Sequence, residues 1–219
     1  MPSSPSPEQL ANLRQEYSLQ GMHRADLDPD PIRQFGRWLS DALAHGILEP
    51  NAMTLATVDA TGQPWTRTVL LKVCDERGFT FFTNYDGSKG RQLAERPVAA
   101  LTFWWPILQR QVNVTGVVTQ TSRTESAHYF ATRPMNSRLG AWASAQSATL
   151  ADRGELERRF EEVRARFGDK EVPLPPQWGG YCVEPRTIEF WQGRQSRLHD
   201  RLRYTRQDGG GWTIDRLAP

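Results

Sequence analysis

The chain has 219 residues, a formal net charge of +2, 38% hydrophobic residues and 24% charged residues. This length allows one large hydrophobic core, and β-rich domains of this size are often single. No window approaches the roughly 20 apolar residues of a membrane-spanning helix, which excludes an integral membrane protein. The nearly balanced charge argues against a broad nucleic-acid-binding surface, so we expect any basic site to be a local pocket.

The N-terminus and the cysteines together favour a cytoplasmic protein. Residues 1–20 are expected to form a flexible segment, in which residues 8–18 are compatible with a short helix, and the start lacks the features of a secretory signal. Cys74 and Cys182 are the two cysteines, without a second pair at metal-ligand spacing. This pattern predicts neither a disulfide framework nor a metal site.

A helix is predicted to begin at Asp30, after a linker over residues 21–29. Asp30 is a good N-cap and Pro31 suits the first helical position. One face is expected to pack inward, because apolar residues recur at helical spacing: Ile32, Phe35, Leu39, Leu43 and Ile47.

The rest of the chain has mainly strand texture, interrupted by helices. Turn residues at 59–62 and 75–78 join successive runs, which favours antiparallel hairpins. We therefore predict a mainly β fold, an antiparallel sheet or barrel with flanking helices. The expected strands are 53–59, 65–73, 79–84, 98–105, 110–120, 178–183, 187–192, 198–204 and 212–217, and the expected amphipathic helices are 122–132 and 152–167.

Three stretches offer donors for phosphate groups, each with a plainer alternative. Arg67 and Lys72 lie on one apolar run at an odd separation, so their side chains should face opposite sides of the strand. They could then bind two different anions. Alternatively, one of them is simply solvated. Residues 84–93 are predicted to form a turn followed by the start of a helix, where Lys89 and main-chain N–H groups could bind a phosphate. The alternative is an ordinary capped helix.

The third stretch is a bend at Pro134. Tyr129, Arg133 and Ser137 recur at intervals of four around it, and their phenol, guanidinium and hydroxyl would make a phosphate cradle. The alternative is a helix end whose arginine lies in solvent.

Residues 140–147 are rich in small side chains and end in Gln146 and Ser147. This composition would allow a ligand or another subunit to approach the backbone closely. The alternative is a plain loop.

The C-terminal run from Glu189 to Leu202 is dense in cationic and aromatic side chains and suits a planar, anionic ligand. Arg197, His199 and Arg201 are expected on one strand face at two-residue steps, which would lower the pKa of His199 and keep its ring neutral. A solvated histidine on an edge strand is the alternative. Covalent hydrolase chemistry finds no support, because neither cysteine nor any serine has a nucleophile motif.

Over nearly its full length the chain resembles the pyridoxine/pyridoxamine 5′-phosphate oxidase family. The stretches that carry the resemblance are Arg14 to Tyr17, Arg67 to Lys72, Arg110-Gln111, Tyr129 with Arg133-Pro134 and Ser137, Gly140 to Trp142, Gln146-Ser147, Pro173 to Pro175, Trp178 to Gly180, Glu189 to Gly193, Arg197 to Arg201, and Asp215 to Pro219.

The resemblance implies an FMN-binding split β-barrel that works as a homodimer with FMN at the interface. Residues 1–20 would be a flexible segment that closes over the active site, and 21–219 a single domain. The implied FMN set is Arg67, Thr68, Val69, Leu70, Leu71, Lys72, Phe82, Thr83, Lys89, Gln111, Gln146, Ser147, Trp191 and Arg201. The implied substrate set is Arg14, Tyr17, Lys72, Tyr129, Arg133, Ser137, Arg197 and His199, the last two being the catalytic candidates.

Two positions depart from the family pattern. Ser88 stands where the family usually has a phosphate-binding arginine, a loss for which Arg91 is a candidate replacement. Phe82 stands where a tyrosine is common, so a side-chain hydroxyl contact is lost.

The implied reaction oxidises pyridoxamine or pyridoxine 5′-phosphate to pyridoxal 5′-phosphate by hydride transfer to flavin, with O2 as the acceptor that yields H2O2. The protein would mainly orient two rings, since the cofactor carries the difficult chemistry. Three alternatives remain: an oxidase on the same barrel that acts on another ring such as a phenazine precursor, a protein that stores flavin or pyridoxal phosphate without turnover, and a nucleic-acid binder.

Overall fold

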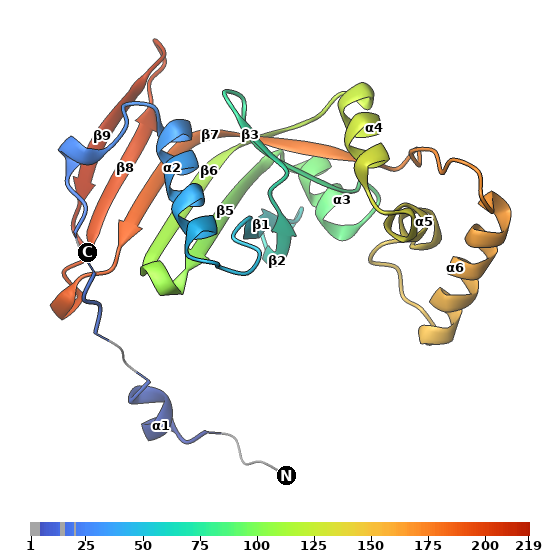
Figure 1. Ribbon diagram of the computed structural model, residues 1–219, viewed down its shortest axis with the longest axis horizontal. Coiled ribbons are helices and arrows are strands. Elements are labelled where there is room, and N and C mark those ends of the chain that lie inside the picture. Colours follow the sequence, from blue (N-terminus) through green and yellow to red (C-terminus); the bar gives the residue numbers. More distant parts are fainter. Residues whose placement is uncertain (1–4, 14–15, 20) are drawn as a thin grey trace.

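The computed structural model describes residues 5–13, 16–19 and 21–219, and is built around one antiparallel sheet (Figure 1). The sheet order is β2-β1-β5-β6-β7-β4-β3, with β8 added to β7 and β9 added to β8. The strands are β1 (Ala52–Val58), β2 (Pro64–Leu70), β3 (Val73–Asp75), β4 (Gly78–Asn84), β5 (Val98–Trp105), β6 (Arg110–Gln120), β7 (Trp178–Gln192), β8 (Asp200–Arg206) and β9 (Trp212–Leu217). The predicted mainly β, antiparallel class is confirmed.

Helices flank this sheet in two places. The helix α2 lies against it near the C-terminal hairpin, whereas α4, α5 and α6 gather at the other end of β7 (Figure 1). The helices are α1 (Pro7–Ala11), α2 (Pro31–Ala44), α3 (Ser88–Glu95), α4 (Arg123–Thr132), α5 (Met135–Ala143) and α6 (Arg153–Phe167), with short 3-10 turns η1 (Arg24–Asp26), η2 (Pro106–Leu108) and η3 (Gln195–Arg197). Among the described residues, no helix is both long enough and apolar enough to cross a membrane.

The long strand β7 organises the whole sheet. One of its edges pairs with β6 along almost its full length, while the other pairs first with β4 and then with β8. The change of partner falls at Pro185, which cannot donate a ladder hydrogen bond. Opposite Pro185 the register shifts at Gly116, where a Cβ would clash with the Glu184 carbonyl. The strand therefore runs continuously from the helices α4–α6 to the C-terminal hairpin.

The main core lies between α2 and the sheet. Asp30 caps α2 by accepting the Ile32 N–H, as predicted, and Phe35 is fully buried against Phe79 and Phe103, with ring centroids 4.9 and 4.8 Å away. The inward face differs in one respect from the sequence pattern. Leu43 is 61% exposed, and the inward positions are instead taken by Trp38 and Ala42.

A second, smaller core joins α4, α5 and α6 to the start of β7. Its buried members are Phe130, Leu139, Val172 and Trp178. The helix α6 was predicted at residues 152–167 and begins one residue later, capped by Asp152, whose side chain accepts the Glu155 N–H. The helix α5 was not predicted, because Pro134 and the small residues after it read as a bend and loop. Pro134 occupies the N-cap of α5, where its missing N–H does no harm.

Three other boundaries differ from the predictions. The expected strand 65–73 divides into β2 and β3, because the Lys72 N–H leaves the first hairpin and donates to the Thr80 carbonyl at 2.8 Å. The expected strands 178–183 and 187–192 are one strand, β7, since β6 supports both halves. The expected strand at 198 begins only at Asp200, because residues 198 and 199 link it to η3, which ends at Arg197.

Candidate functional site

Two cavities lie at opposite ends of β7. One, which we call the helix-side cavity, has a volume of about 510 Å³ and is lined by Thr68, Val69, Leu70, Lys72, Phe82, Thr83, Lys89, Tyr129, Thr132, Arg133, Pro134, Ser137, Gln146 and Trp178. The other, the C-terminal cavity, has a volume of about 560 Å³ and is lined by Leu13, Glu16, Tyr17, Trp191, Arg194, Ser196, Arg197 and His199.

Most of the residues predicted from the sequence line one of these cavities. The helix-side cavity collects eight of the FMN candidates and four of the substrate candidates, Lys72 being in both sets. The C-terminal cavity collects Trp191 from the FMN set and Tyr17, Arg197 and His199 from the substrate set. Arg14 lies outside the described residues. The predicted site is therefore divided between two places in one chain.

The FMN candidates that do not line a cavity lie next to residues that do. Leu71 links β2 to Lys72, and its N–H donates to the Asn51 carbonyl at 2.9 Å. Gln111 and Arg201 are the strand partners of Trp191, on β6 and β8 respectively. Arg67 and Ser147 flank the helix-side cavity and contact the helix α3 or its start.

Arg67 is held in the sheet by neutral oxygens. Its guanidinium donates to the Thr57 hydroxyl at 2.5 Å, to the Gln92 side-chain oxygen at 3.0 Å and to the Leu55 carbonyl at 3.3 Å. Burial lowers the pKa of Arg67, but an arginine remains charged at neutral pH. The contacts fix the side chain without neutralising it.

A second cation, Lys89, stands close to Arg67 at the start of α3. Its ammonium donates to the Gln146 side-chain oxygen at 2.7 Å and to the Thr83 hydroxyl at 3.3 Å. Burial, and then the positive charge of Arg67, lower the pKa of Lys89. Two neighbouring cations with neutral partners form a site that an anion would stabilise.

The first turn of α3 fits such an anion. Its N-cap, Gly87, forms no side-chain cap hydrogen bond, and the turn has no acidic residue. The Ser88 N–H donates to the Ser147 hydroxyl at 3.1 Å, which ties the Gln146-Ser147 segment to this helix end. Gly87 lets Gln146 lie close to this helix end, because a Cβ at position 87 would be 2.6 Å from the Gln146 side-chain oxygen.

A third cation of the helix-side cavity, Arg133, lies over aromatic rings. Arg133 is the C-cap of α4, and its guanidinium carbon lies 4.7 Å from the Trp178 ring centroid. Phe82 and Tyr129 stack beside Trp178, with a centroid distance of 4.1 Å between them. Arg133 Nη1 is buried and has no hydrogen-bond partner among the described residues. Burial lowers the pKa of Arg133.

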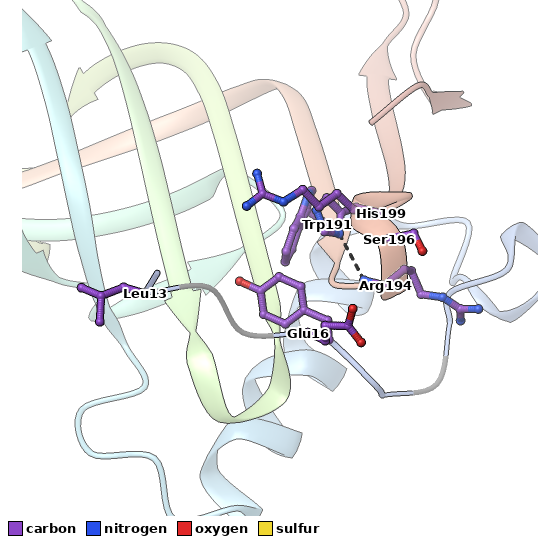
Figure 2. Close-up of a pocket in the computed structure, with 8 residues that line it drawn as sticks. Leu13, Glu16, Trp191, Arg194, Ser196 and His199 are labelled. Atoms are coloured by element: carbon purple, nitrogen blue, oxygen red, sulfur yellow. Dashed lines mark hydrogen bonds between the residues drawn. The ribbon is translucent and has the colours of Figure 1, made fainter. Parts of the chain in front are cut away.

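The C-terminal cavity joins the N-terminal segment to the C-terminal strands. Figure 2 shows Glu16, Trp191, Arg194 and His199 around the same cavity. The rings of Tyr17, Trp191 and His199 form one cluster, with centroids 4.5 to 5.7 Å apart. Gly193 allows this contact, because a Cβ there would lie 2.7 Å from Tyr17 Cγ.

His199 is held in one tautomer by the main chain. Its Nδ1 accepts the Arg194 N–H at 3.1 Å (Figure 2), which leaves Nε2 to carry the proton of the neutral ring. The pKa of His199 is lowered mainly by burial and secondly by the charge of Arg197. The sequence predicted the direction of this shift but attributed it to two flanking arginines alone.

The predicted common strand face for Arg197, His199 and Arg201 is wrong. Arg197 lies in η3, before β8 begins, and both Ser196 and Arg197 have left-handed backbones with φ of 55° and 60°. Arg201 is on β8 and forms a two-pronged ion pair with Glu189, at 2.9 and 3.1 Å. A tight turn, rather than strand alternation, presents Arg197 to the cavity.

Sequence reasoning missed residues that only the fold brings to these cavities. Trp178 and Thr132 line the helix-side cavity, and Glu16 and Arg194 line the C-terminal one. Trp104 also belongs with the second group, because strand pairing aligns it with Gln111 and Trp191, and its ring lies 5.9 Å from that of Trp191. Trp104 is 45% exposed, a signal that sequence alone does not give.

The two departures from the family pattern, Ser88 and Phe82, have different consequences. Ser88 and Arg91 line a separate neighbouring cavity, and Arg91 donates to the Asp86 carbonyl, so replacement of the missing arginine by Arg91 stays a prediction. Phe82 contributes its ring face to the aromatic stack, a contact that does not need a hydroxyl.

Comparison with known proteins explains why these residues occur together. A family model described as pyridoxamine 5′-phosphate oxidase matches residues 39–167. A second, described as the pyridoxine 5′-phosphate oxidase C-terminal dimerisation region, matches residues 178–219. The chain belongs to the pyridoxine/pyridoxamine 5′-phosphate oxidase family. It is accordingly an oxidoreductase, and the dimerisation region indicates a homodimer.

Curated members of this oxidase family match nearly the whole chain. A pyridoxine/pyridoxamine 5′-phosphate oxidase from Nostoc punctiforme is 56% identical over 96% of this chain and 98% of its own length. Pyridoxine/pyridoxamine 5′-phosphate oxidase 1 from Ralstonia nicotianae is 58% identical over 96% of this chain and 99% of its own length.

Solved structures confirm the split-barrel fold. PhzG from Burkholderia lata 383, in complex with tetrahydrophenazine-1-carboxylic acid, is 31% identical, with a TM-score of 0.86 over 94% of this chain and 100% of that one. A pyridoxamine 5′-phosphate oxidase-related, FMN-binding protein from Nostoc punctiforme is 18% identical, with a TM-score of 0.68 over 84% of this chain and 96% of that one.

Proposed function

We propose that this chain is an FMN-dependent oxidase that converts pyridoxamine or pyridoxine 5′-phosphate to pyridoxal 5′-phosphate, with O2 as the acceptor. The observation that carries the proposal is the presence of two separate groups of phosphate donors in and beside the helix-side cavity. Arg67 and Lys89 form one group, and Arg133 with Tyr129 and Ser137 forms the other. FMN and the substrate each bring one phosphate.

The charges of the site support anionic ligands. Among the residues that the structure describes, no carboxylate forms an ion pair with Arg67, Lys89, Arg133 or Arg197. Arg67, Lys89 and Arg133 are partly buried, and cations removed from solvent are normally paired, so their lack of counter-ions supports a ligand as the partner; Arg197 is exposed.

The first donor group fits the phosphate of FMN. Arg67 and Lys89 would contact its oxygens, and the start of α3 would add main-chain N–H groups. Gln146 and Thr83, which now share a hydrogen bond at 3.1 Å, would contact the polar part of the cofactor. These roles also follow the positions matched in the family.

The second donor group fits the substrate phosphate. Arg133 has an unpartnered buried Nη1, and Tyr129, Ser137 and Lys72 line the same cavity. Charge-assisted hydrogen bonds from such donors contribute about 1.5–3 kcal/mol each. They would fix the substrate while leaving its ring free to lie on the flavin.

Arg197 and His199 would act at the substrate ring. With His199 Nδ1 occupied by the Arg194 N–H, the Nε2–H can donate to a polar ring substituent. Arg197 brings a charge that would assist at the reacting carbon, and Tyr17 would cover the site from the N-terminal segment. These residues bind and orient, so the chemistry itself falls to the cofactor.

The separation of the two cavities supports an interface site. The part of β7 from Gly180, the partner of Phe82, to Trp191 would span roughly 35 Å at about 3.3 Å per residue. One flavin cannot contact both ends of this strand. In a two-fold dimer the helix-side cavity of one subunit can meet the C-terminal cavity of the other, which completes two equal sites.

The chemistry that FMN would supply is two-electron oxidation at the substrate carbon that becomes the aldehyde, with O2 taking up the electrons as H2O2. With the amine substrate, water would then replace the nitrogen, which would leave as ammonia. The product, pyridoxal 5′-phosphate, places the enzyme in the synthesis and salvage of this cofactor. The two free cysteines, Cys74 and Cys182, support a location in the reducing cytoplasm.

A phenazine-directed oxidase is the nearest competing function, since PhzG shares this fold. The identity of 31% to PhzG is much lower than the 56–58% to the curated pyridoxine/pyridoxamine 5′-phosphate oxidases. The phosphate donors Arg133, Tyr129 and Ser137 further favour a phosphorylated substrate.

The deciding experiment is anaerobic mixing of FMN-loaded protein with pyridoxamine 5′-phosphate. We expect the flavin absorbance to bleach, pyridoxal 5′-phosphate to form, and the colour to return when air is admitted. An unchanged spectrum in FMN-replete protein would contradict the proposal and favour a different substrate or a storage role.

A further inference from the structure

Arg133 is held by aromatic faces instead of by hydrogen bonds. Its guanidinium carbon lies 4.7 Å from the Trp178 ring centroid and 5.5 Å from that of Phe130. Its Nη1 is buried without a partner among the described residues, and no carboxylate described there pairs with it. A ring face attracts the cation without occupying its N–H donors, so the guanidinium N–H groups, which form a planar fork, stay available to an anion.

The backbone brings Arg133 to this position but does not fix its side chain. Arg133 ends α4 in an extended conformation, because the following Pro134 disfavours a helical backbone before it. Its main-chain N–H donates to the Phe130 carbonyl at 3.1 Å. Orientation of the guanidinium therefore depends on the rings beneath it.

Trp178 is the ring that connects Arg133 to the rest of the cavity. It is 6% exposed, and its plane lies within 9° of Phe82 and within 7° of Tyr129. Its main chain is anchored as the first residue of β7, where its carbonyl accepts from the Arg123 guanidinium at 2.7 Å. One indole thus lies under Arg133 and parallel to Tyr129, whose ring centroid is 6.1 Å away.

We propose that Trp178 is a positioning residue for recognition of the substrate phosphate. It orients the Arg133 fork and the Tyr129 phenol before the substrate arrives, and it leaves their donors free. The inference rests on the proposed function, because it takes the anion at Arg133 to be the phosphate of the B6 substrate. Trp178 would then govern selectivity for phosphorylated over unphosphorylated substrates.

The test compares Trp178→Leu and Trp178→Phe with the wild type, all loaded with FMN. For Trp178→Leu we expect KM for pyridoxamine 5′-phosphate to rise roughly 3- to 30-fold, the range of a buried cation–π contact, with kcat within about twofold. The kcat/KM for unphosphorylated pyridoxamine should stay unchanged, and Trp178→Phe should restore most of the loss. Competition by inorganic phosphate should weaken in parallel with KM.

Trp142→Leu is the matched control. Trp142 belongs to the same small core, and Arg166 lies over its ring at 5.1 Å, but neither residue lines the helix-side cavity. Its loss should lower stability without changing the ratio of phosphorylated to unphosphorylated substrate. An equal change of that ratio in Trp142→Leu would overturn the positioning role.

A double-mutant cycle keeps the proposal testable if Trp178→Leu does not fold. In an Arg133→Ala, Tyr129→Phe background, Trp178→Met, which keeps an apolar side chain but loses the ring face, should cause no further loss of phosphate selectivity, since both groups that Trp178 positions are gone. Independent, additive effects would refute the inference. Calorimetric binding of inorganic phosphate to the FMN-loaded variants gives the same comparison without turnover, so a wild type that fails to oxidise the substrate would contradict only the proposed function.

Discussion

At the scale of single residues, the environments of the cations differ in a way that separates their roles. Arg67 is fixed by Thr57, Gln92 and a main-chain carbonyl, all of them neutral, and lies beside Lys89. Arg197 sits in an exposed turn next to His199 and Tyr17. The first environment suits a phosphate that stays bound, and the second suits a ring that arrives and leaves.

We therefore expect Arg67→Ala and Arg197→Ala to fail in different ways. Arg67→Ala should weaken FMN roughly ten- to a hundredfold, because a charged hydrogen bond of about 1.5–3 kcal/mol is lost. Arg197→Ala should retain FMN but slow its anaerobic reduction by the substrate. Flavin fluorescence titration measures the first effect, and stopped-flow absorbance measures the second. Equal loss of FMN in both variants would show that the roles are not divided.

At the scale of elements, the turn η3 stands out because it has two consecutive left-handed residues that are not glycine. Ser196 and Arg197 have φ of 55° and 60°, a conformation that is unfavourable for residues with a Cβ. Backbone strain of this kind persists where the surroundings impose it, often at functional sites. Here the turn directs Arg197 toward His199 and the C-terminal cavity.

Relief of this strain should be measurable as stability. Ser196 is exposed, so Ser196→Gly removes little packing, and we expect the free energy of unfolding to increase by about 0.5–1 kcal/mol. Gln195→Gly is the control, because Gln195 lies in the same turn without a left-handed backbone and should lose about 0.5–1 kcal/mol. Urea unfolding at one fixed protein concentration makes the comparison. A decrease in both variants would argue against strain at Ser196.

At the scale of the whole molecule, β7 is the element that separates the two cavities. It carries Trp178 at its start and Trp191 near its end, and the two cavities that these residues line have no lining residue in common. The C-terminal strands β8 and β9 belong to the region matched as a dimerisation region. A homodimer with composite sites reconciles these observations.

Hybrid dimers test the composite site directly. Arg133→Ala damages the helix-side cavity and Arg197→Ala the C-terminal cavity, so each homodimer should be nearly inactive. Co-expressed at equal levels, the two variants should recover roughly a quarter of wild-type activity, because about half of the dimers are hybrids and each has one intact site. Activity that stays at the level of the separate variants would place both residues in the same subunit's site.

Much of the local structure could be predicted from the sequence because it depends on neighbouring residues. The Asp30 cap, the turns at 59–62 and 75–78 and the spacing of α6 follow from capping, turn chemistry and periodicity. Long-range pairing accounts for the errors. The pairing of β6 merged two expected strands into β7, and the Lys72–Thr80 hydrogen bond divided another.

The sequence by itself determined the inventory: an antiparallel β protein, the chemistry of its arginines and lysines, and a family resemblance strong enough to imply an oxidase. Only the tertiary structure decided how these residues are arranged in space. It placed Arg133 on the ring of Trp178, 45 positions away in the chain, and Arg197 in a strained turn, and it separated the two cavities along β7. The reason is physical: residue types and spacing set local preferences, whereas contacts between distant segments depend on strand register and packing.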